Sequence, residues 1–410
     1  MTETEKRVPD LRFKGFIEDW EQRKLGEVGE LNRGKSKHRP RNDAKLFGGS
    51  YPFIQTGDVA KAGLYLTNYG QTYSDFGIQQ SKLWNEGTLL ITIAANIAET
   101  SILGIKAAFP DSVIAFESDD VDMVFVKNVI DKISDMLKRT AETSSQANLN
   151  LAKLSELKID LPSIGEQIKI GAFFKQLDDT IALHQRKLTL LEQLKQTYQL
   201  GMFPHNGGSI PALRFAGFSE PWEQRKLNDL YEKGGSGGTP QSTNKSYYMG
   251  DIPFLGISDI SASNGYIYDT EKHISEKGLN NSSAWIVPKE AISLAMYASV
   301  GKVAILKTEA ATSQAFYNMV FKKISTRNFI FQYLLKIEST NGWNRLISTG
   351  TQANLNAQKV RDLEIMIPSL EEQDKIGTFF NRIDHTIDLH QKKISHIQDL
   401  KKALLQKMFI

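Results

Sequence analysis

The sequence predicts an α+β protein with two mixed α/β domains separated by two long helices. These helices are expected to pair as an intramolecular coiled coil within a pseudo-two-fold tandem repeat. Three observations predict this fold. Two helical seams begin at Ser163 and Ser369, 206 positions apart. The segments that open at Pro9 and Pro211 match one another. The run Gln-Ala-Asn-Leu-Asn precedes each seam unchanged, at residues 146–150 and 352–356.

The composition is that of an ordinary soluble protein. The chain has 410 residues, of which 40% are hydrophobic and 24% charged, a length that favours two or three domains. The absence of cysteine excludes disulfides, thiolate-bound zinc and a cysteine nucleophile. No apolar run approaches a membrane span and residues 1–10 lack a signal-peptide core, so we expect a cytoplasmic protein without membrane attachment. A net charge of +3 is too small to indicate a nucleic-acid partner by itself.

The opening segments show that the chain is duplicated. Between Pro9–Val28 and Pro211–Leu230, 13 of 20 positions are identical without a gap, including Trp20 with Trp222. We expect each of these tryptophans to anchor the core of its domain. A period near 200 residues is far too long for a solenoid. A whole domain and its helix are therefore repeated.

The globular parts combine strand-like and helix-like segments. Thr88–Ile93 and Val121–Val126 have the β-branched and apolar content of strands. Asn128–Thr140 and Phe329–Ile337 have the periodicity of short amphipathic helices. Pro204–Ser209 is rich in turn residues and marks the boundary between the copies.

These signals divide the chain into four segments. We expect the first α/β domain at residues 1–155, followed by the first long helix at 156–203. The second domain is expected at 204–361 and the second helix at 362–410.

Each long helix has a recognisable start and a heptad seam. Ser163 with Glu166, and Ser369 with Glu372, have the spacing of a capping box, in which each side chain satisfies a backbone donor. Apolar residues then recur at the four–three spacing of a helix that packs along another helix. About 30 residues of seam correspond to roughly 45 Å of helix. The predicted interface positions are Ile170, Phe174, Leu177, Ile181, Leu188, Leu191, Ile376, Phe380, Ile383, Ile387, Ile394 and Ile397.

Polar residues interrupt the two seams at matching places. His184 corresponds to His390, and Lys195 corresponds to Lys401. Paired histidines suggest a metal site or a pH switch. Single polar seam residues, however, mostly fix register and pairing in coiled coils. We therefore assign these histidines no chemistry and expect no metal site.

The centres of the two domains diverge while their frames agree, which suggests one mechanical role and two different ligands. Arg33–Lys45 carries six lysines or arginines against one acid, broken by glycine and proline, and reads as a basic loop. It could neutralise DNA phosphates or be a solvated loop, and both interpretations remain open. The candidate DNA-binding residues in this loop are Lys35, Lys37, Arg39, Arg41 and Lys45.

Gly234–Lys245 is the positional counterpart of the basic loop. Its glycines could let backbone N–H groups approach a phosphate, with polar side chains as readers, although a flexible surface loop explains it equally well. It is not a Walker A loop, because no Gly-Lys-Ser/Thr follows at the required spacing. The candidates here are Thr239, Gln241, Ser242, Asn244 and Lys245.

Two tight connections add further candidates. Tyr297–Lys302 lies between strand-like segments, and Ala94–Ser101 holds the same place in the first copy. A plain hairpin is the favoured interpretation of either connection alone. The remaining candidate DNA-binding residues are Gln55, Thr56, Ser258, Tyr297, Ser299 and Lys302.

Several catalytic motifs are absent from the sequence. It contains no Asn/Asp-Pro-Pro-Tyr/Phe motif for amino-group methylation, no Gly-x-Gly-x-x-Gly after a strand and no His-Glu-x-x-His. The chain is therefore expected to bind rather than to catalyse, and no catalytic residue is assigned.

The complete pattern resembles the specificity subunit of type I restriction-modification systems. The resemblance covers essentially the whole chain, although the first copy carries the basic loop in place of a Gly-Gly-Thr-Pro run. The residues that carry it are Gly15-Phe16, Trp20 and Lys24-Leu25 with their copies Gly217-Phe218, Trp222 and Lys226-Leu227, then Gly237–Pro240, Ile252-Pro253-Phe254, Asp259-Ile260, Gln146, Asn148-Leu149, Leu157, Ile159, Pro162, Glu166-Gln167, Ile170, Glu372-Gln373 and Ile376.

The resemblance implies two target recognition domains, each reading one half of an interrupted DNA sequence. The two helices would form an antiparallel coiled coil that acts as a spacer and docks two modification subunits. Those subunits would bind S-adenosylmethionine and methylate adenine at N6. Two restriction subunits using ATP and Mg²⁺ would complete the complex, so no cofactor is expected on this chain. A rod of roughly 45 Å agrees with two domains about one turn apart on B-DNA, ~34–36 Å.

Three alternatives remain open. The first is a coiled-coil scaffold whose domains bind proteins without DNA specificity. The second is a nuclease or methyltransferase in its own right, which no motif supports. The third keeps the family but makes the chain part of a modification-only system or a silent recombination cassette.

Overall fold

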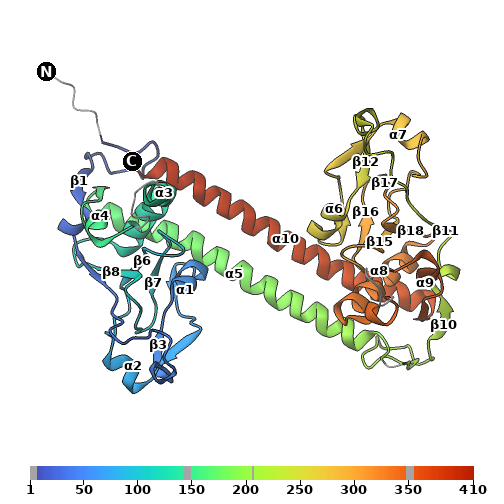
Figure 1. Cartoon of the computed structure of the whole chain (residues 1–410), viewed down its shortest axis with the longest axis horizontal. Helices are drawn as coiled ribbons and strands as arrows, with labels where there is room; N and C mark the ends of the chain where they lie inside the picture. Colours follow the sequence, from blue (N-terminus) through green and yellow to red (C-terminus); the bar gives the residue numbers. More distant parts are fainter. Residues whose placement is uncertain (1–6, 143–148, 206, 348–354) are drawn as a thin grey trace. The chain divides into compact units, whose positions relative to one another are not determined.

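The computed structural model describes residues 7–142, 149–205, 207–347 and 355–410, which form two compact units. The first unit contains residues 1–186 and 391–410, and the second contains 187–390. Two helices of 39 residues each, α5 (Ile164–Met202) and α10 (Leu370–Met408), contribute to both units (Figure 1). The units cut across the four segments predicted from the sequence, whose bounds stay predictions.

The first unit contains a five-stranded sheet of order β2-β8-β6-β7-β4 and two small sheets, β3-β5 and β1-β9. Its strands are β1 (Glu21–Lys24), β2 (Glu30–Arg33), β3 (Phe47–Phe53), β4 (Tyr65–Leu66), β5 (Gln71–Tyr73), β6 (Leu89–Thr92), β7 (Thr100–Leu103), β8 (Val113–Glu117) and β9 (Lys158–Leu161). Its shorter helices are α1 (Thr56–Lys61), α2 (Asp75–Gln79), α3 (Met123–Glu142) and α4 (Leu151–Ser155), with 3-10 turns η1 (Leu25–Glu27) and η2 (Ala44–Leu46).

The second unit repeats this plan with sheets β11-β18-β15-β16-β13, β14-β12-β17 and β10-β19. Its strands are β10 (Glu223–Lys226), β11 (Lys233–Ser236), β12 (Ile252–Leu255), β13 (Tyr266–Ile267), β14 (Lys272–Ile274), β15 (Ile292–Ala295), β16 (Val303–Leu306), β17 (Ala311–Thr312), β18 (Phe316–Val320) and β19 (Glu364–Ile367). Its shorter helices are α6 (Ile257–Ala262), α7 (Glu276–Asn280), α8 (Ile324–Ser339) and α9 (Ala357–Arg361), with η3 (Leu227–Asp229), η4 (Lys245–Tyr248) and η5 (Gly342–Arg345).

One predicted strand is wrong. Val121–Val126 runs into helix α3, which begins at Met123. The Asp122 carboxylate accepts a hydrogen bond from the backbone N–H of Phe125 (2.7 Å) and so satisfies a donor of the first turn. Phe125 is fully buried in the core, so tertiary packing outweighs local strand preference here. The helices expected at Asn128–Thr140 and Phe329–Ile337 are present as parts of α3 and α8.

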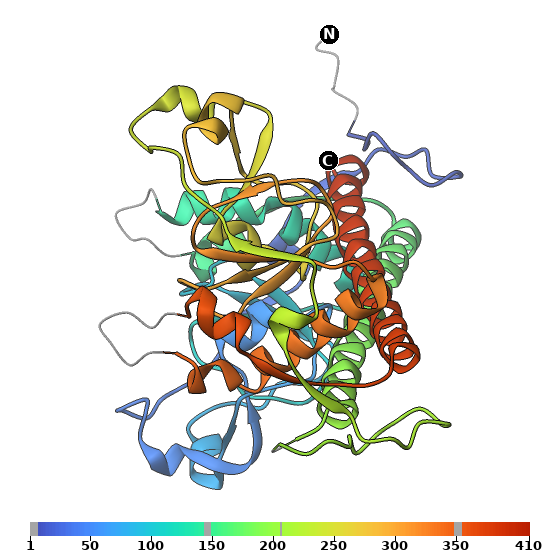
Figure 2. The same ribbon diagram turned by 90° about the vertical axis from the view of Figure 1, so that its right-hand side faces the viewer.

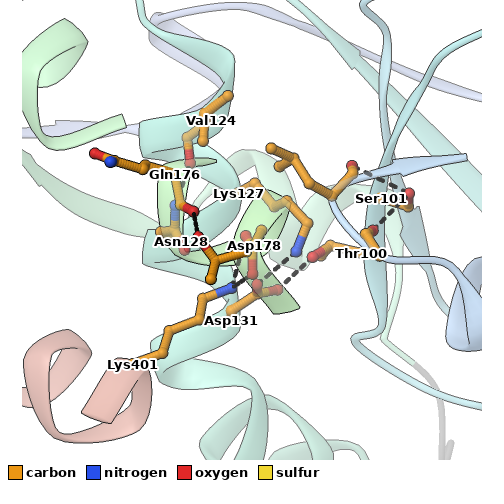
Figure 3. A network of polar contacts seen from close by, with 12 residues as sticks. Thr100, Ser101, Val124, Lys127, Asn128, Asp131, Gln176, Asp178 and Lys401 are labelled. Atoms are coloured by element: carbon orange, nitrogen blue, oxygen red, sulfur yellow. Dashed lines mark hydrogen bonds and ion pairs between the residues drawn. The ribbon is translucent and has the colours of Figure 1, made fainter. Parts of the chain in front are cut away.

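In each unit the two long helices pair in antiparallel fashion. In the first unit Lys401, late in α10, binds Asp178, early in α5, with nitrogen–oxygen distances of 2.6 and 2.9 Å (Figure 3). In the second unit Lys195, late in α5, binds Asp384, early in α10, at 2.7 Å. The two lysines that interrupt the seams are thus interhelical ion-pair partners, and both pairs are largely buried.

The opening segment of each copy clasps the start of its own helix. Both carboxylate oxygens of Glu166 accept from the guanidinium of Arg12 at 2.7 Å, and Glu166 is completely buried. Arg214 binds Glu372 in the same way at 2.7 and 2.8 Å. The helices begin next to Ser163 and Ser369 as predicted, but their glutamates hold an arginine about 155 residues away in addition to any capping role.

The core of each unit also contains the end of the helix from the other copy. Trp20 packs against Phe125 and Phe409, and Phe409 follows the last residue of α10. In the second unit Trp222 packs against Phe203, which follows α5. In the first unit the opening segment passes the end of α10, where the N–H of Leu11 donates to the carbonyl of Lys407 at 2.8 Å (Figure 2). Both tryptophans are buried core anchors, as the sequence predicted.

We predict that Arg12→Met destabilises the first unit by about 3–5 kcal/mol, because it leaves the buried carboxylate of Glu166 without its partner. Urea unfolding followed by circular dichroism measures this loss. The matched control is Lys175→Met, which breaks an exposed ion pair with Asp179 and should cost less than about 0.5 kcal/mol. Equal losses in the two variants would contradict a stabilising role of the buried Arg12–Glu166 pair.

We also predict that Phe409→Ala lowers the free energy of unfolding by about 3 kcal/mol, because it opens a cavity beside Trp20 and Phe125. Ile410→Ala, at the exposed neighbouring position, should change stability by less than about 0.5 kcal/mol. Thermal unfolding of both variants checks the comparison. A Phe409→Ala variant as stable as the parent would show that the helix end is dispensable for the first core.

Candidate nucleic-acid interface

Loops gather at one edge of each five-stranded sheet. In the first unit Arg33 and Ile91 both pair with Ile114, with β2 and β6 antiparallel to β8. The chain segments that follow β2 and β6 therefore leave the sheet at the same edge. This edge carries the basic loop, residues 34–45, and the β6–β7 connection, residues 93–99. Strand β4, parallel to β7, also starts there. We call this the loop edge.

The second unit has an equivalent loop edge. Ser236 and Leu294 both pair with Tyr317, so the segments after β11 and β15 leave the sheet together. These segments are the glycine-rich loop, residues 237–245, and the β15–β16 connection, residues 296–302. The hydroxyls of Ser299 on this connection and Ser261 on α6 lie 2.9 Å apart. One architectural position in each unit therefore carries the segments that diverge most between the copies.

Hydrogen bonds and ion pairs of its own side chains hold the basic loop in place. Arg39 donates to the carbonyl oxygens of Ser36 (2.6 Å) and His38 (2.8 Å), and Arg41 binds Asp111 at 2.6 Å. The backbone N–H of Lys45 and the ring of His38 both bind Asp43 and, in that order of strength, lower the pKa of its carboxyl. Two of the five cationic candidates, Arg39 and Arg41, therefore hold the loop together.

The three lysine candidates of this loop remain available for anions. Lys35, Lys37 and Lys45 are exposed, and none has an ion-pair partner in the part of the chain that the structure describes. Their backbone is fixed: the carbonyl of Lys35 accepts from Ser81 at 2.7 Å, and the N–H of Lys37 donates to Gln80 at 3.1 Å. Three exposed ammonium groups on one loop carry the charge that would bind the phosphates of a DNA backbone.

The glycines of the second loop have a role that the sequence did not predict. A Cβ on Gly237 would lie 1.9 Å from the carbonyl oxygen of Thr312, so only glycine fits there. The N–H of Gly237 donates to Phe316 (3.4 Å), and that of Gly238 donates to Thr312 (2.9 Å). The hypothesis that these two N–H groups face a phosphate is therefore wrong. Gly34 occupies the equivalent close approach in the first unit, against the carbonyl of Pro110.

The polar candidates of the second loop differ in availability. The hydroxyl of Thr239 donates to the side chain of Gln314, and the amide oxygen of Asn244 accepts from the N–H of Ser246 at 3.1 Å. These two side chains are engaged in holding the loop. Gln241, Ser242 and Lys245 are exposed.

Other predicted residues lie at helix starts or on the strand connections. Gln55 and Ser258 lie at the starts of α1 and α6, where they bind Gln71 at 2.6 Å and Glu271 at 3.3 Å. Thr56, half-buried, is the first residue of α1.

The β15–β16 connection carries three candidates. Tyr297 and Ser299 are exposed at its tip. Lys302 lies 3.7 Å from Glu338 on α8, so its charge is already partnered. Burial raises the pKa of the Glu338 carboxyl.

The predicted seam residues are all at least half-buried. Fully buried positions are Ile170, Phe174, Ile181, Ile376, Phe380, Ile383 and Ile397, and half-buried positions are Leu177, Leu188, Leu191, Ile387 and Ile394. The histidines of the seam are buried (His184) and half-buried (His390). Within the described residues no cluster of histidine and carboxylate side chains could hold a metal ion. The same residues include no helix with the length and apolar content to cross a membrane.

The structure also shows partners that sequence reasoning missed. Asp178 and Asp384 bind the seam lysines, and Arg12 and Arg214 bind the helix-start glutamates. Comparison of the chain with itself could have found them, because both aspartates are 206 positions apart and both arginines belong to the repeated opening segment.

A family model for the type I restriction modification DNA specificity domain matches residues 17–193 and again residues 219–399. These two matches cover most of the chain. The chain belongs to this family. The family resemblance of the sequence is thereby confirmed.

Similar proteins support the assignment. The MjaIX specificity subunit of Methanocaldococcus jannaschii is 33% identical over 192 residues, which are 46% of this chain and 44% of that protein. The chain thus matches under half the length of that relative. The MjaVIII specificity subunit of the same organism is 21% identical over 95% of this chain and 91% of its own length. The S subunit from M. genitalium has the same fold, with a TM-score of 0.68 at 15% identity over 98% of this chain and 99% of its own.

We predict that Lys35→Ala with Lys37→Ala weakens binding to non-specific duplex DNA and lowers the slope of log affinity against log salt by about two. Fluorescence anisotropy between roughly 50 and 200 mM salt measures the slope. Lys158→Ala, on strand β9 outside the loop edge, is the matched control and should leave it unchanged. An unchanged slope in the double variant would show that the basic loop is only a solvated loop.

Proposed function

We propose that this specificity subunit recognises a bipartite DNA target, with one half-site bound by each unit. The observation that carries the proposal is that two sheets of equivalent strand order present different loops at the same edge. The first edge offers free lysines, and the second offers exposed Gln241 and Ser242 on a loop built around glycines. A common frame with two unlike binding edges is what the reading of two unlike half-sites requires.

We further propose that the long helices dock two modification subunits. Leu183 on α5 and Leu389 on α10 occupy equivalent positions and are 50% and 52% exposed. Leu194 and Leu400 form a second equivalent pair, each 43% exposed. Large apolar side chains left in solvent on a helix favour coverage by a partner. Their exact repetition favours two copies of the same partner.

The remaining assignments complete the proposal. Two restriction subunits would join the two modification subunits in the full complex. S-adenosylmethionine would bind the modification subunit, and ATP with Mg²⁺ would bind the restriction subunit, so this chain would carry no cofactor and perform no catalysis. The complex would act in the cytoplasm on double-stranded DNA.

The test is adenine methylation mapping by long-read sequencing in cells with and without the gene, with the modification partner expressed in both. We expect a methylated motif of two short half-sites around a fixed gap only when the gene is present. Replacing residues 30–145 by the same segment of a relative with another target should then change one half-site alone. This exchange keeps the second unit, so the second half-site is an internal control.

The contrary outcome is equally clear. If no methylated motif depends on the gene although the modification subunit is present, bipartite recognition by this chain is wrong. Co-purification of a protein with the two units, but without any DNA binding, would then favour a coiled-coil scaffold.

A further inference from the structure

Two short connections at the loop edges form the tips of equivalent hairpins. Residues 94–98 are the central part of the β6–β7 connection, and residues 297–301 are the central part of the β15–β16 connection; we call these the hairpin tips. Asn96 is the exposed polar side chain of the first tip, and Tyr297 is the large exposed side chain of the second, with 40% of its surface accessible.

Both tips have a backbone conformation that non-glycine residues rarely adopt. Ala95 and Ala298, at equivalent positions, have φ of 49° and 43°. Ala98 and Ser299 have φ of 60° and 38°. The described residues include six such non-glycine residues, so four of the six lie in these two short segments. This conformation is unfavourable for a residue with a Cβ atom, and it is retained where the surrounding structure fixes the backbone.

The first tip is held by backbone hydrogen bonds within its hairpin and by side-chain contacts with helix α3. The N–H of Thr92 donates to the carbonyl of Glu99 at 3.0 Å, and the N–H of Ala98 donates to the carbonyl of Thr92 at 2.9 Å. The Glu99 carboxylate binds Lys138 on α3 at 2.8 Å. Next to it, Thr100 binds Asp131 of α3, which also accepts from Lys127 at 2.6 Å (Figure 3).

The second tip has the same brace with the charges exchanged. The N–H of Ala295 donates to the carbonyl of Lys302 at 2.8 Å, which closes the hairpin as in the first unit. Lys302 then binds Glu338 on α8, whereas the first tip has its acid on the hairpin and its lysine on the helix. The frame is therefore conserved between the copies as an ion pair, while the exposed side chains of the tips differ.

We propose that the hairpin tips are base-reading elements, with Asn96 reading the first half-site and Tyr297 the second. This inference rests on the proposed bipartite recognition and names residues that determine it. An asparagine amide can pair with N6 and N7 of an adenine in the major groove, so an adenine is the base that Asn96 would select. The first tip leaves the same sheet edge as Lys35 and Lys37, which would fix the register on the phosphates. A rigid tip keeps such a pairing selective, because a misaligned base cannot be accommodated by loop movement.

The experiment is methylation mapping with the full chain assembled with its modification subunits, comparing the parent, Asn96→Ala and Tyr297→Ala. We expect Asn96→Ala to relax one base position of one half-site, with discrimination against the other bases falling about tenfold or more. The other half-site should be unchanged. Tyr297→Ala should alter only the half-site that Asn96→Ala leaves intact.

Matched controls lie at the opposite edges of the same sheets. Asn85 precedes β6 and Tyr268 follows β13, and both are exposed. Asn85→Ala and Tyr268→Ala should leave the methylated motif as it is in the parent. Thermal unfolding and assembly with the modification subunit test whether all four variants keep the fold.

The outcomes separate this inference from the function on which it rests. If the parent produces a bipartite motif and Asn96→Ala and Tyr297→Ala reproduce it with unchanged discrimination, the hairpin tips do not read bases and bipartite recognition stands. Loss of discrimination in both half-sites from a single substitution would also overturn the inference. If the parent produces no motif, the proposed function itself fails.

Discussion

Each domain core depends on the end of a helix that starts in the other copy. Phe409 completes the core around Trp20, and Phe203 completes the core around Trp222. A helix that leaves one core must therefore finish in the other, which two helices achieve only by running in opposite directions. The buried pairs of Arg12 with Glu166 and of Arg214 with Glu372 fix the helix starts at the same junctions. The sheets that present the loop edges therefore depend on this exchange of helix ends.

The charges inside the helix pair define its register. A buried ion pair contributes little net stability, because removing two charges from water costs nearly as much as their attraction returns. Its value is specificity, since a polar seam residue penalises every alignment that leaves it unpaired. Lys401 with Asp178 and Lys195 with Asp384 are related by the internal repeat. A shift of one helix along the other would therefore separate both ion pairs at once. Apolar residues alone would tolerate such a shift.

The sequence predicted features that repeat along the chain, but it did not predict which residues far apart in the chain contact one another. The heptad spacing and the copy of Trp20 at Trp222 predicted the helices, their pairing and the duplication, because both signals are visible in the order of residues. The antiparallel direction came from the family resemblance. The start of α3 was misassigned because burial of Phe125 outweighs local strand preference. The close approach of Gly237 to Thr312 spans 75 residues and leaves no local trace. The sequence predicted which side chains belong to the candidate site, but it did not predict which of the lysines and arginines are free to bind an anion.

The reversed ion pairs at the hairpin tips show how a fixed frame can carry variable contacts. Glu99 with Lys138 and Lys302 with Glu338 each tie a hairpin to the neighbouring helix, with the charges exchanged between the two copies. Asn96 and Tyr297 belong to neither ion pair, and both are exposed. Substitutions at Asn96 or Tyr297 therefore leave packing, helix pairing and the docking faces untouched. A recognition protein built in this way can acquire a new target without destabilising the assembly in which it works.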